Sequence, residues 1–334
     1  MLLSGWMRTP RIKIVPEEGE AVYHCMSRSV NGEWLFDEPA KEVMRKQLWD
    51  VMDFCGVKVV TYILLSNHFH VLVRVPKRVP IPDAELLRRY RVLHPHPTRY
   101  QTVRLKVIEQ WLAANTPEGE AWRQRMQKLM GDVSVFMKLF KQRYSIWFNK
   151  SHDRFGTLWA ERFKSVLVEG ADGVLRIKAA YIDLNCVRAG ITNDPKDYRF
   201  CGYAEAVAGN ELMREGLGSV CGENTWEKNQ AAYRQMLFGT GVGPREKGAS
   251  ISLEDFKKVV AEGGKLPLPE VLRCRVRYFT DGAVLGSQAF VQTQLAVYRA
   301  RTGRRRCRAP WPLPAITDWG ELSMLRGLRG PALG

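Results

Sequence analysis

Two strand-like segments separated by only two residues constrain the fold more than any other feature of this 334-residue chain. Residues 57–65 are rich in β-branched and aromatic side chains, and residues 68–75 (HFHVLVRV) place an apolar side chain at every second position. Ser66 and Asn67 form the connection. A parallel pair of strands needs a crossover of a dozen or more residues, so these strands are expected to form an antiparallel hairpin.

Further strand and helix patterns surround this hairpin and predict the fold class. The expected elements are a strand at 21–29, helices at 39–54 and 132–149, a strand at 161–169 and a helix at 172–188. Residues 77–131 are charged, contain several prolines and are expected to form a helical insertion. The order β-α-β-β-(insertion)-α-β-α predicts an α+β fold, in which helices pack against an antiparallel sheet.

The chain is longer than one typical domain of roughly 100–200 residues, so more than one unit is expected. The expected segments are an N-terminal arm (1–19), a main domain (20–205) that contains the insertion, a linker (206–250), a small helical unit (251–308) and an irregular tail (309–334). The helical unit ends in an arginine cluster and is expected to contribute affinity for DNA rather than chemistry.

The net charge of the chain indicates the class of its binding partner. Lys and Arg number 51 against 35 Asp and Glu, a formal net charge of +16. This surplus indicates a polyanion, most often nucleic acid, with a membrane surface as the weaker alternative. The longest apolar run, 57–65, is far shorter than the ~20 residues of a membrane helix. The N-terminus does not resemble a signal peptide, and the seven cysteines include no Cys-x-x-Cys pair, so a reducing cytoplasm is expected.

The sharpest chemical signal is the pair His68 and His70. Alternate residues of a strand share a face, so both imidazoles point to one side of the sheet, with Arg74, and Phe69 points to the other. Two imidazoles roughly 7 Å apart on a rigid strand can hold a divalent ion if a third ligand comes from elsewhere. The alternative is two unrelated histidines, although the chain has only six in all.

A second candidate site lies on the helix expected at 172–188. Tyr181 and Asn185 are four residues apart and therefore lie on one helical face, and Arg188 follows on the same side. A phenol, an amide oxygen and a guanidinium in one row can act as nucleophile, metal ligand and phosphate contact. The alternative is an ordinary half-buried tyrosine on a packed helix.

Basic residues gather in two parts of the chain. Between 138 and 164, Lys and Arg alternate with Trp and Phe, a pattern suited to single-stranded nucleic acid or to a solvated helix face over an aromatic core. Six arginines between 299 and 308 suggest contacts to a DNA backbone, or a basic tail. The candidate DNA-binding residues are Arg74, Arg143, Arg162, Lys164, Arg188, Arg304, Arg305 and Arg306.

Four segments together resemble a known family. They are YHCMSRSVNGEWLF at 23–36, YILLSNHFHVLV at 62–73, GTLWAERFKSVLVE at 156–169 and YIDLNCVRAGI at 181–191. In this order they resemble the REP-associated tyrosine transposases, which belong to the single-tyrosine HUH transposases, over about residues 20–205. The resemblance implies a ferredoxin-like, RRM-like HUH endonuclease fold with the HUH strand at its centre. The unit at 251–308 resembles an extension of some members, with a helix-turn-helix character.

The resemblance also implies roles for individual residues. His68 and His70 match the HUH pair, Tyr181 matches the nucleophile and Asn185 matches a third metal ligand. The family usually has proline after this asparagine, whereas this chain has Cys186, so the local helix geometry is expected to differ. The implied cofactor is Mg²⁺ or Mn²⁺, with no small-molecule cofactor. The implied partner is single-stranded DNA with imperfect hairpins, bound by a monomer or homodimer in the bacterial cytoplasm, associated with the nucleoid.

The chemistry implied by this resemblance is transesterification of DNA. Tyr181 attacks a phosphate and forms a 5′-phosphotyrosine, and a 3′-hydroxyl is released that can later reverse the step. A phenol has a reference pKa of about 10, so a nearby cation must favour its anion. Two alternatives stay open: a non-catalytic nucleic-acid-binding regulator, and a metal-dependent nuclease that uses water and forms no covalent adduct.

Overall fold

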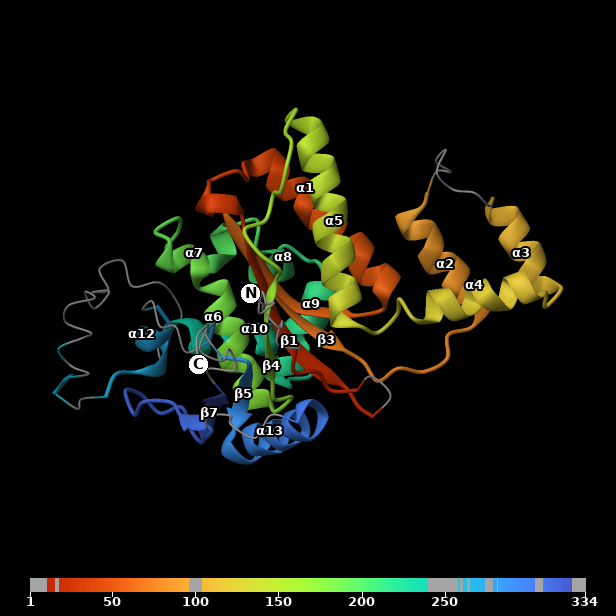
Figure 1. Ribbon diagram of the computed structural model, residues 1–334. Helices are drawn as coiled ribbons and strands as arrows, with labels where there is room; N and C mark the ends of the chain where they lie inside the picture. Colours follow the sequence, from red (N-terminus) through yellow and green to blue (C-terminus); the bar gives the residue numbers. More distant parts are fainter. Residues whose placement is uncertain are drawn as a thin grey trace, which may run out of the picture.

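The structure is a computed structural model, and it places helices on both sides of a single sheet (Figure 1). It describes residues 11–15, 18–95, 104–239, 258, 261–262, 265–273, 279–280, 282–303 and 309–325. The strands are β1 (Ala21–Arg28), β2 (Lys58–Leu64), β3 (His68–Val75), β4 (Lys164–Val168), β5 (Val284–Ser287), β6 (Trp311–Pro312) and β7 (Leu322–Leu325). The α+β class is therefore confirmed.

The helices come from every part of the described chain. They are α1 (Glu38–Cys55), α2 (Asp83–Leu93), α3 (Leu105–Ala113), α4 (Pro117–Gln127), α5 (Val133–Ser151), α6 (Asp172–Asp183), α7 (Asn185–Arg188), α8 (Gly202–Val207), α9 (Glu211–Cys221), α10 (Trp226–Phe238), α12 (Leu268–Arg273) and α13 (Gln288–Thr302), with short 3-10 turns η1 (Val30–Gly32) and η2 (Pro195–Asp197). Among the described residues, no helix is long and apolar enough to cross a membrane.

The sheet has the strand order β2-β3-β1-β4-β5-β7-β6. The first four strands in this order are antiparallel to one another, and β1, α1, β2, β3, α5 and β4 follow in the βαββαβ order of a ferredoxin-like unit. The strands β2 and β3 form the predicted hairpin. In the register of β1 and β3, Arg28 lies opposite His68 and Met26 lies opposite His70. The strand that carries the two histidines is thus internal to the sheet.

One face of the sheet packs against α1 and α5 through apolar and aromatic side chains. Phe69 is fully buried, and its ring lies 5.3 Å from that of Phe140 and 5.5 Å from that of Trp159, between centroids. Tyr144 of α5 donates a hydrogen bond of 3.2 Å to the Ala40 carbonyl of α1. Phe136, Phe140 and Phe148 are buried, as the sequence predicts for a helix over an aromatic core.

The opposite face packs against α6 and α9. Thr61 of β2 donates to the Asp183 carboxylate at the end of α6 over 2.8 Å. Gly216 of α9 lies against β2, where a Cβ atom would come within 2.6 Å of the Val59 carbonyl oxygen. Only glycine allows this approach, and the close packing brings the α6 layer onto the same face as His70.

The insertion forms an arm of three helices, α2, α3 and α4, which projects away from the sheet (Figure 1). These helices fall within the segment expected at 77–131. Ion pairs join the arm to itself and to α1: Arg123 contacts Asp83 at 2.7 Å, and Arg88 contacts Asp53 at 2.6 Å. Many of the arm's cations are therefore already paired with acidic side chains.

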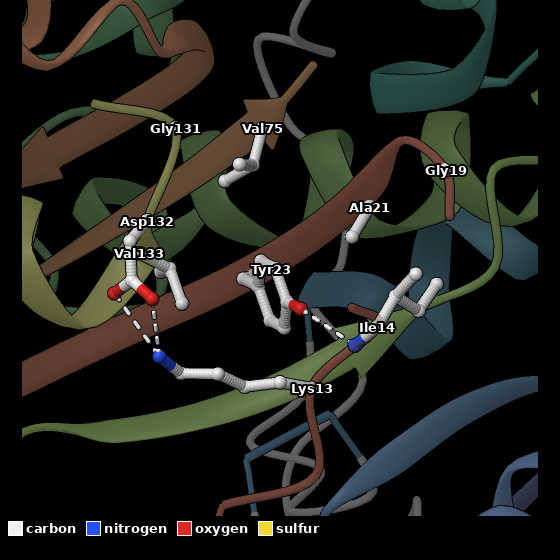
Figure 2. Close-up of a pocket in the computed structure, with 9 residues that line it drawn as sticks. All are labelled: Lys13, Ile14, Gly19, Ala21, Tyr23, Val75, Gly131, Asp132 and Val133. Atoms are coloured by element: carbon white, nitrogen blue, oxygen red, sulfur yellow. Dashed lines mark hydrogen bonds and ion pairs between the residues drawn. The ribbon is translucent and has the colours of Figure 1, made fainter. Parts of the chain in front are cut away.

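The described part of the N-terminal arm, residues 11–15, lies along β1. Lys13 pairs with Asp132 at 2.8 Å, and the Ile14 amide donates to the Tyr23 hydroxyl over 3.1 Å (Figure 2). Asp132 also caps α5 by accepting hydrogen bonds from the Ser134 and Val135 amides. The pocket that these segments line has a volume of only about 10 Å³, room for about one water molecule. The arm is thus attached at this point.

The C-terminal part adds strands to the same sheet, which corrects the expectation of a purely helical unit at 251–308. The strand β5 pairs in parallel with β4, and β7 pairs with β5. Ser287 ends β5 and caps α13, and it donates to Glu169 through its amide at 2.6 Å and its hydroxyl at 2.9 Å. The β5 segment, Val284–Ser287, is only four residues long, too short to show a period in the sequence.

Two other segments also differ from expectation. The linker expected at 206–250 contains α9 and α10, which bury Leu217 and Tyr233 against the core. The tail expected to be irregular from 309 contains β6 and β7, and all four residues of β7 are buried. The helix α9 packs on β2 and the strand β7 pairs with β5, so contacts with distant segments stabilise these elements more than local propensity does.

Candidate active site

The strand β3 places His68 and His70 on one face, with ring centroids 5.2 Å apart. Phe69 points to the α5 layer on the other side, as the alternation predicts. His68 lies at the start of the strand and is half-buried, whereas His70 is buried. The pair therefore lies at the edge of the α6 layer, with one ring inside the protein and one near its surface.

Each histidine has its Nδ1 atom engaged. His68 Nδ1 lies 2.6 Å from the side-chain oxygen of Asn67, which can only accept, so His68 carries its proton on Nδ1. His70 Nδ1 lies 2.8 Å from Nε2 of the buried His24. His24 Nδ1 in turn lies 3.3 Å from the Phe279 carbonyl oxygen.

This chain of contacts assigns the tautomer of His70. The Phe279 carbonyl accepts a hydrogen bond from His24 Nδ1–H, so a neutral His24 accepts a hydrogen bond from His70 through its Nε2 atom. Burial lowers the pKa of both His24 and His70 well below the ordinary value of about 6.5, which keeps both rings neutral at neutral pH. His70 therefore presents an unprotonated Nε2 atom.

These two histidines fit a divalent metal ion. Metal-ligating histidines characteristically donate their second ring nitrogen to a neighbouring acceptor, and Asn67 and His24 are such acceptors. Among the described residues, no group of three His, Cys, Asp or Glu side chains is placed to hold a metal ion. A third protein ligand would have to be of another type, such as the amide of Asn185.

Tyr181 lies on α6, and its side chain faces the sheet. Its ring lies 6.5 Å from that of His24 and 4.7 Å from that of Phe279, between centroids. The Arg188 guanidinium lies 4.2 Å from the centre of the Tyr181 ring and donates to the Tyr181 carbonyl over 2.5 Å. Tyr181 is 6% exposed, so its ring is held between the sheet and these neighbours.

Asn185 follows one turn later, where the helix breaks. The single helix expected at 172–188 is divided at Leu184 into α6 and α7, and Asn185 is the first residue of α7. Its amide nitrogen donates to the Ile182 carbonyl at 2.9 Å and to the Tyr181 carbonyl at 3.3 Å. Its side-chain oxygen is therefore the atom suited to a metal, and its role as third ligand stays a prediction.

Residues near the C-terminus complete the surroundings of Tyr181. The Phe279 carbonyl accepts hydrogen bonds from His24 and from the buried Lys178, and the Leu272 carbonyl accepts from Arg188 over 2.5 Å. The expectation that the C-terminal segment contributes only DNA affinity is therefore incomplete. Sequence reasoning missed His24 and Phe279. The alternation of β1 could have indicated His24, which shares a face with Met26, whereas no local pattern marks Phe279.

The predicted DNA-binding residues are found in several different settings. Arg74 pairs with Glu20 at 2.5 Å, and Lys164 pairs with Glu161 at 3.0 Å. Arg162 is exposed, Arg143 is half-buried on α5, and Arg188 contacts Tyr181. Arg304, Arg305 and Arg306 lie outside the described residues. Their contacts to DNA stay predictions.

Comparison with known proteins finds a similar chain among the solved structures. No family model and no curated protein matches this chain. A solved structure described as a REP-associated tyrosine transposase bound to a REP hairpin matches 61% of this chain and 87% of its own, with 13% sequence identity and a TM-score of 0.39.

Proposed function

We propose that this chain is a metal-dependent enzyme that cleaves and rejoins single-stranded DNA through Tyr181. One observation carries the proposal: His68 and His70, each with its Nδ1 atom engaged by a neighbouring side chain, lie on the sheet face that the Tyr181 helix covers. The motif resemblance supports the same chemistry. The net charge of +16 supports a nucleic-acid substrate and, with it, a place at the bacterial nucleoid.

His68, His70 and the side-chain oxygen of Asn185 would hold Mg²⁺ or Mn²⁺. When bound, such an ion supplies Lewis-acid polarisation of the scissile phosphate. The Tyr181 oxygen attacks phosphorus, the bond to the 3′ oxygen breaks, and the 5′ phosphate stays on the tyrosine. Arg188 places a positive charge beside the ring, where the phosphate has to approach. Single-stranded DNA with imperfect hairpins is the substrate that the resemblance implies.

A labelled hairpin-bearing single strand, incubated with the protein and Mg²⁺ or Mn²⁺ and run on a denaturing gel, tests the proposal. We expect a covalent protein–DNA adduct that disappears with EDTA. The variant Tyr181→Phe should lose the adduct and keep its DNA affinity, because every phosphate contact remains. Tyr144→Phe is the matched control, because it also removes a buried hydroxyl but lies on the α5 face of the sheet.

The burial of Tyr181 favours a second candidate, a metal-dependent nuclease that uses water. Its ring is 6% exposed and contacts Phe279 and Arg188, so these neighbours have to shift before the hydroxyl can reach a phosphate. Cleavage without an adduct, unchanged in Tyr181→Phe, would support this candidate and contradict the covalent mechanism. Binding without any cleavage would support a non-catalytic regulator.

A further inference from the structure

Two large aromatic side chains are exposed on two loops that are bonded to each other and, through Asn67, to His68. The first loop, residues 29–36, follows β1 and carries Trp34, which is 83% exposed. The second loop, residues 152–160, follows α5 and carries Phe155, which is 91% exposed. Other aromatic rings of the same loops, Phe36 and Trp159, are buried. The two exposed rings are therefore not needed for the core.

The two loops are joined to each other. The Val30 amide donates to the Leu158 carbonyl over 3.0 Å, and Ser29 and Trp159 form an isolated β-bridge. Glu33 pairs with Arg154 at 3.5 Å. Because Glu33 immediately precedes Trp34 and Arg154 immediately precedes Phe155, this ion pair holds together the backbone segments that carry the two rings.

The first loop is also joined to the candidate metal ligand. Asn67, whose side-chain oxygen orients His68, donates through its amide nitrogen to the Gly32 carbonyl over 3.0 Å. The Ser29 amide donates to the Asn67 carbonyl over 2.9 Å. One asparagine thus holds both the His68 ring and the loop of Trp34, which fixes the two relative to each other.

Charge around the two rings suits a polyanion. Arg28 is exposed opposite His68 in the register of β1 and β3, and Lys150 is exposed at the end of α5. Of the acidic groups nearby, Glu33 pairs with Arg154 and Asp37 accepts from the Ala40 amide at the start of α1, whereas Asp153 on the second loop is exposed. Arg28 and Lys150 supply the exposed positive charge on this side.

We propose that Trp34 and Phe155 stack on unpaired bases of single-stranded DNA next to the phosphate that reacts at His68. This inference rests on the proposed function and assigns it a base-binding surface. Exposed rings beside cations are what single strands require, because every base has a face that stacks on an aromatic ring. A protein partner would need a wider apolar patch, whereas the flanking residues Asn31, Asp153 and Thr157 are polar.

Binding of a fluorescein-labelled single-stranded oligonucleotide to the full chain tests the surface. We expect Trp34→Ala and Phe155→Ala each to weaken binding by between about 5-fold and 150-fold, the range for the loss of one base–aromatic stack. Trp34→Phe and Phe155→Tyr should retain most of the affinity, whereas Phe155→Leu should not. The slope of affinity against salt should stay constant, because no phosphate contact is removed.

Ile146→Ala and Leu212→Ala are matched controls, since both remove exposed apolar side chains elsewhere, 62% and 49% exposed. An oligonucleotide with abasic sites should bind all variants equally. Alanine variants that bind like the wild type while keeping their melting temperature would overturn the inference. So would an equal loss on blunt duplex DNA, or a change in oligomeric state that shows the rings to be a self-association surface.

The covalent-adduct assay separates this inference from the proposed function. If the wild type forms the adduct and the alanine variants bind DNA normally, the proposed chemistry is supported and the stacking surface is refuted. If binding to single strands depends on the two rings but no adduct forms, the stacking surface is supported and the proposed chemistry is refuted.

Discussion

The two faces of the central sheet bury very different side chains. The face toward α5 buries the ring of Phe69 in contact with those of Phe140 and Trp159. The face toward α6 buries His24, His70, Lys178 and Asp183, each with a hydrogen-bond partner. Burying polar groups costs free energy unless they are hydrogen-bonded, so the second face keeps its groups in place through specific partners. The first face should govern stability and the second should govern chemistry.

Truncation of Phe69 should show the largest effect on stability and sharpen this contrast. Phe69→Ala removes a fully buried ring between two others, which should lower the free energy of unfolding by about 3–5 kcal/mol. Denaturant unfolding followed by circular dichroism measures this loss. The fraction that stays folded should bind Mn²⁺ like the wild type, because Phe69 points away from His68 and His70. A large loss of metal affinity in the folded fraction would contradict the division between the faces.

Substitution of His24 should have a smaller effect, and the effect should appear in metal binding. His24→Leu removes the acceptor of His70 Nδ1, so the tautomer of His70 is no longer fixed. Loss of such a partner typically lowers metal affinity 10–100-fold. Titration of Mn²⁺, followed by electron paramagnetic resonance, measures this change in the full chain without DNA.

His152→Leu is the control for that experiment, because it removes a histidine of the α5 layer that bonds the Phe148 carbonyl at 2.9 Å. His24→Gln should recover part of the affinity, since its amide oxygen can accept from His70. If His24→Leu binds Mn²⁺ as tightly as the control does, His24 does not orient His70.

The contrast between the faces also explains how far the sequence could predict the structure. The hairpin of β2 and β3, the side to which Phe69 points and the common face of His68 and His70 all follow from strand alternation, which is a local rule. His24 and Phe279 act through contacts between distant segments, with 255 residues between them in sequence number. The strands β5 and β7 are four residues each, too short for a periodic signal, and only pairing with β4 and with each other creates them.

The break between α6 and α7 could be predicted only in part from the local sequence. The sequence places Tyr181 and Asn185 on one helical face, and the structure keeps them one turn apart, with Asn185 bonded back to the Tyr181 carbonyl. The local motif therefore predicts their neighbourhood. It does not predict the change of backbone at Leu184, where ψ is 0° at the end of α6.

The hydrogen bond between Tyr233 and Asp183 provides the last and smallest test. Tyr233 of α10 donates to the Asp183 carboxylate over 2.5 Å, and Thr61 of β2 donates to its other oxygen over 2.8 Å. Burial raises the pKa of Asp183 to about 7, so this carboxyl group depends on its donors. Tyr233→Phe should lower the free energy of unfolding by about 1–3 kcal/mol, the cost of leaving a buried polar group without one partner.

Tyr198→Phe, which removes a hydroxyl that donates to the Leu64 carbonyl over 2.6 Å, provides a comparison at a neutral acceptor and should cost about 1 kcal/mol. Combining Tyr233→Phe with Thr61→Val should cost a different amount from the sum of the single changes, because both hydroxyls serve one carboxyl group. Additive losses in this double-mutant cycle would mean that the polar face is a set of independent contacts rather than a connected network.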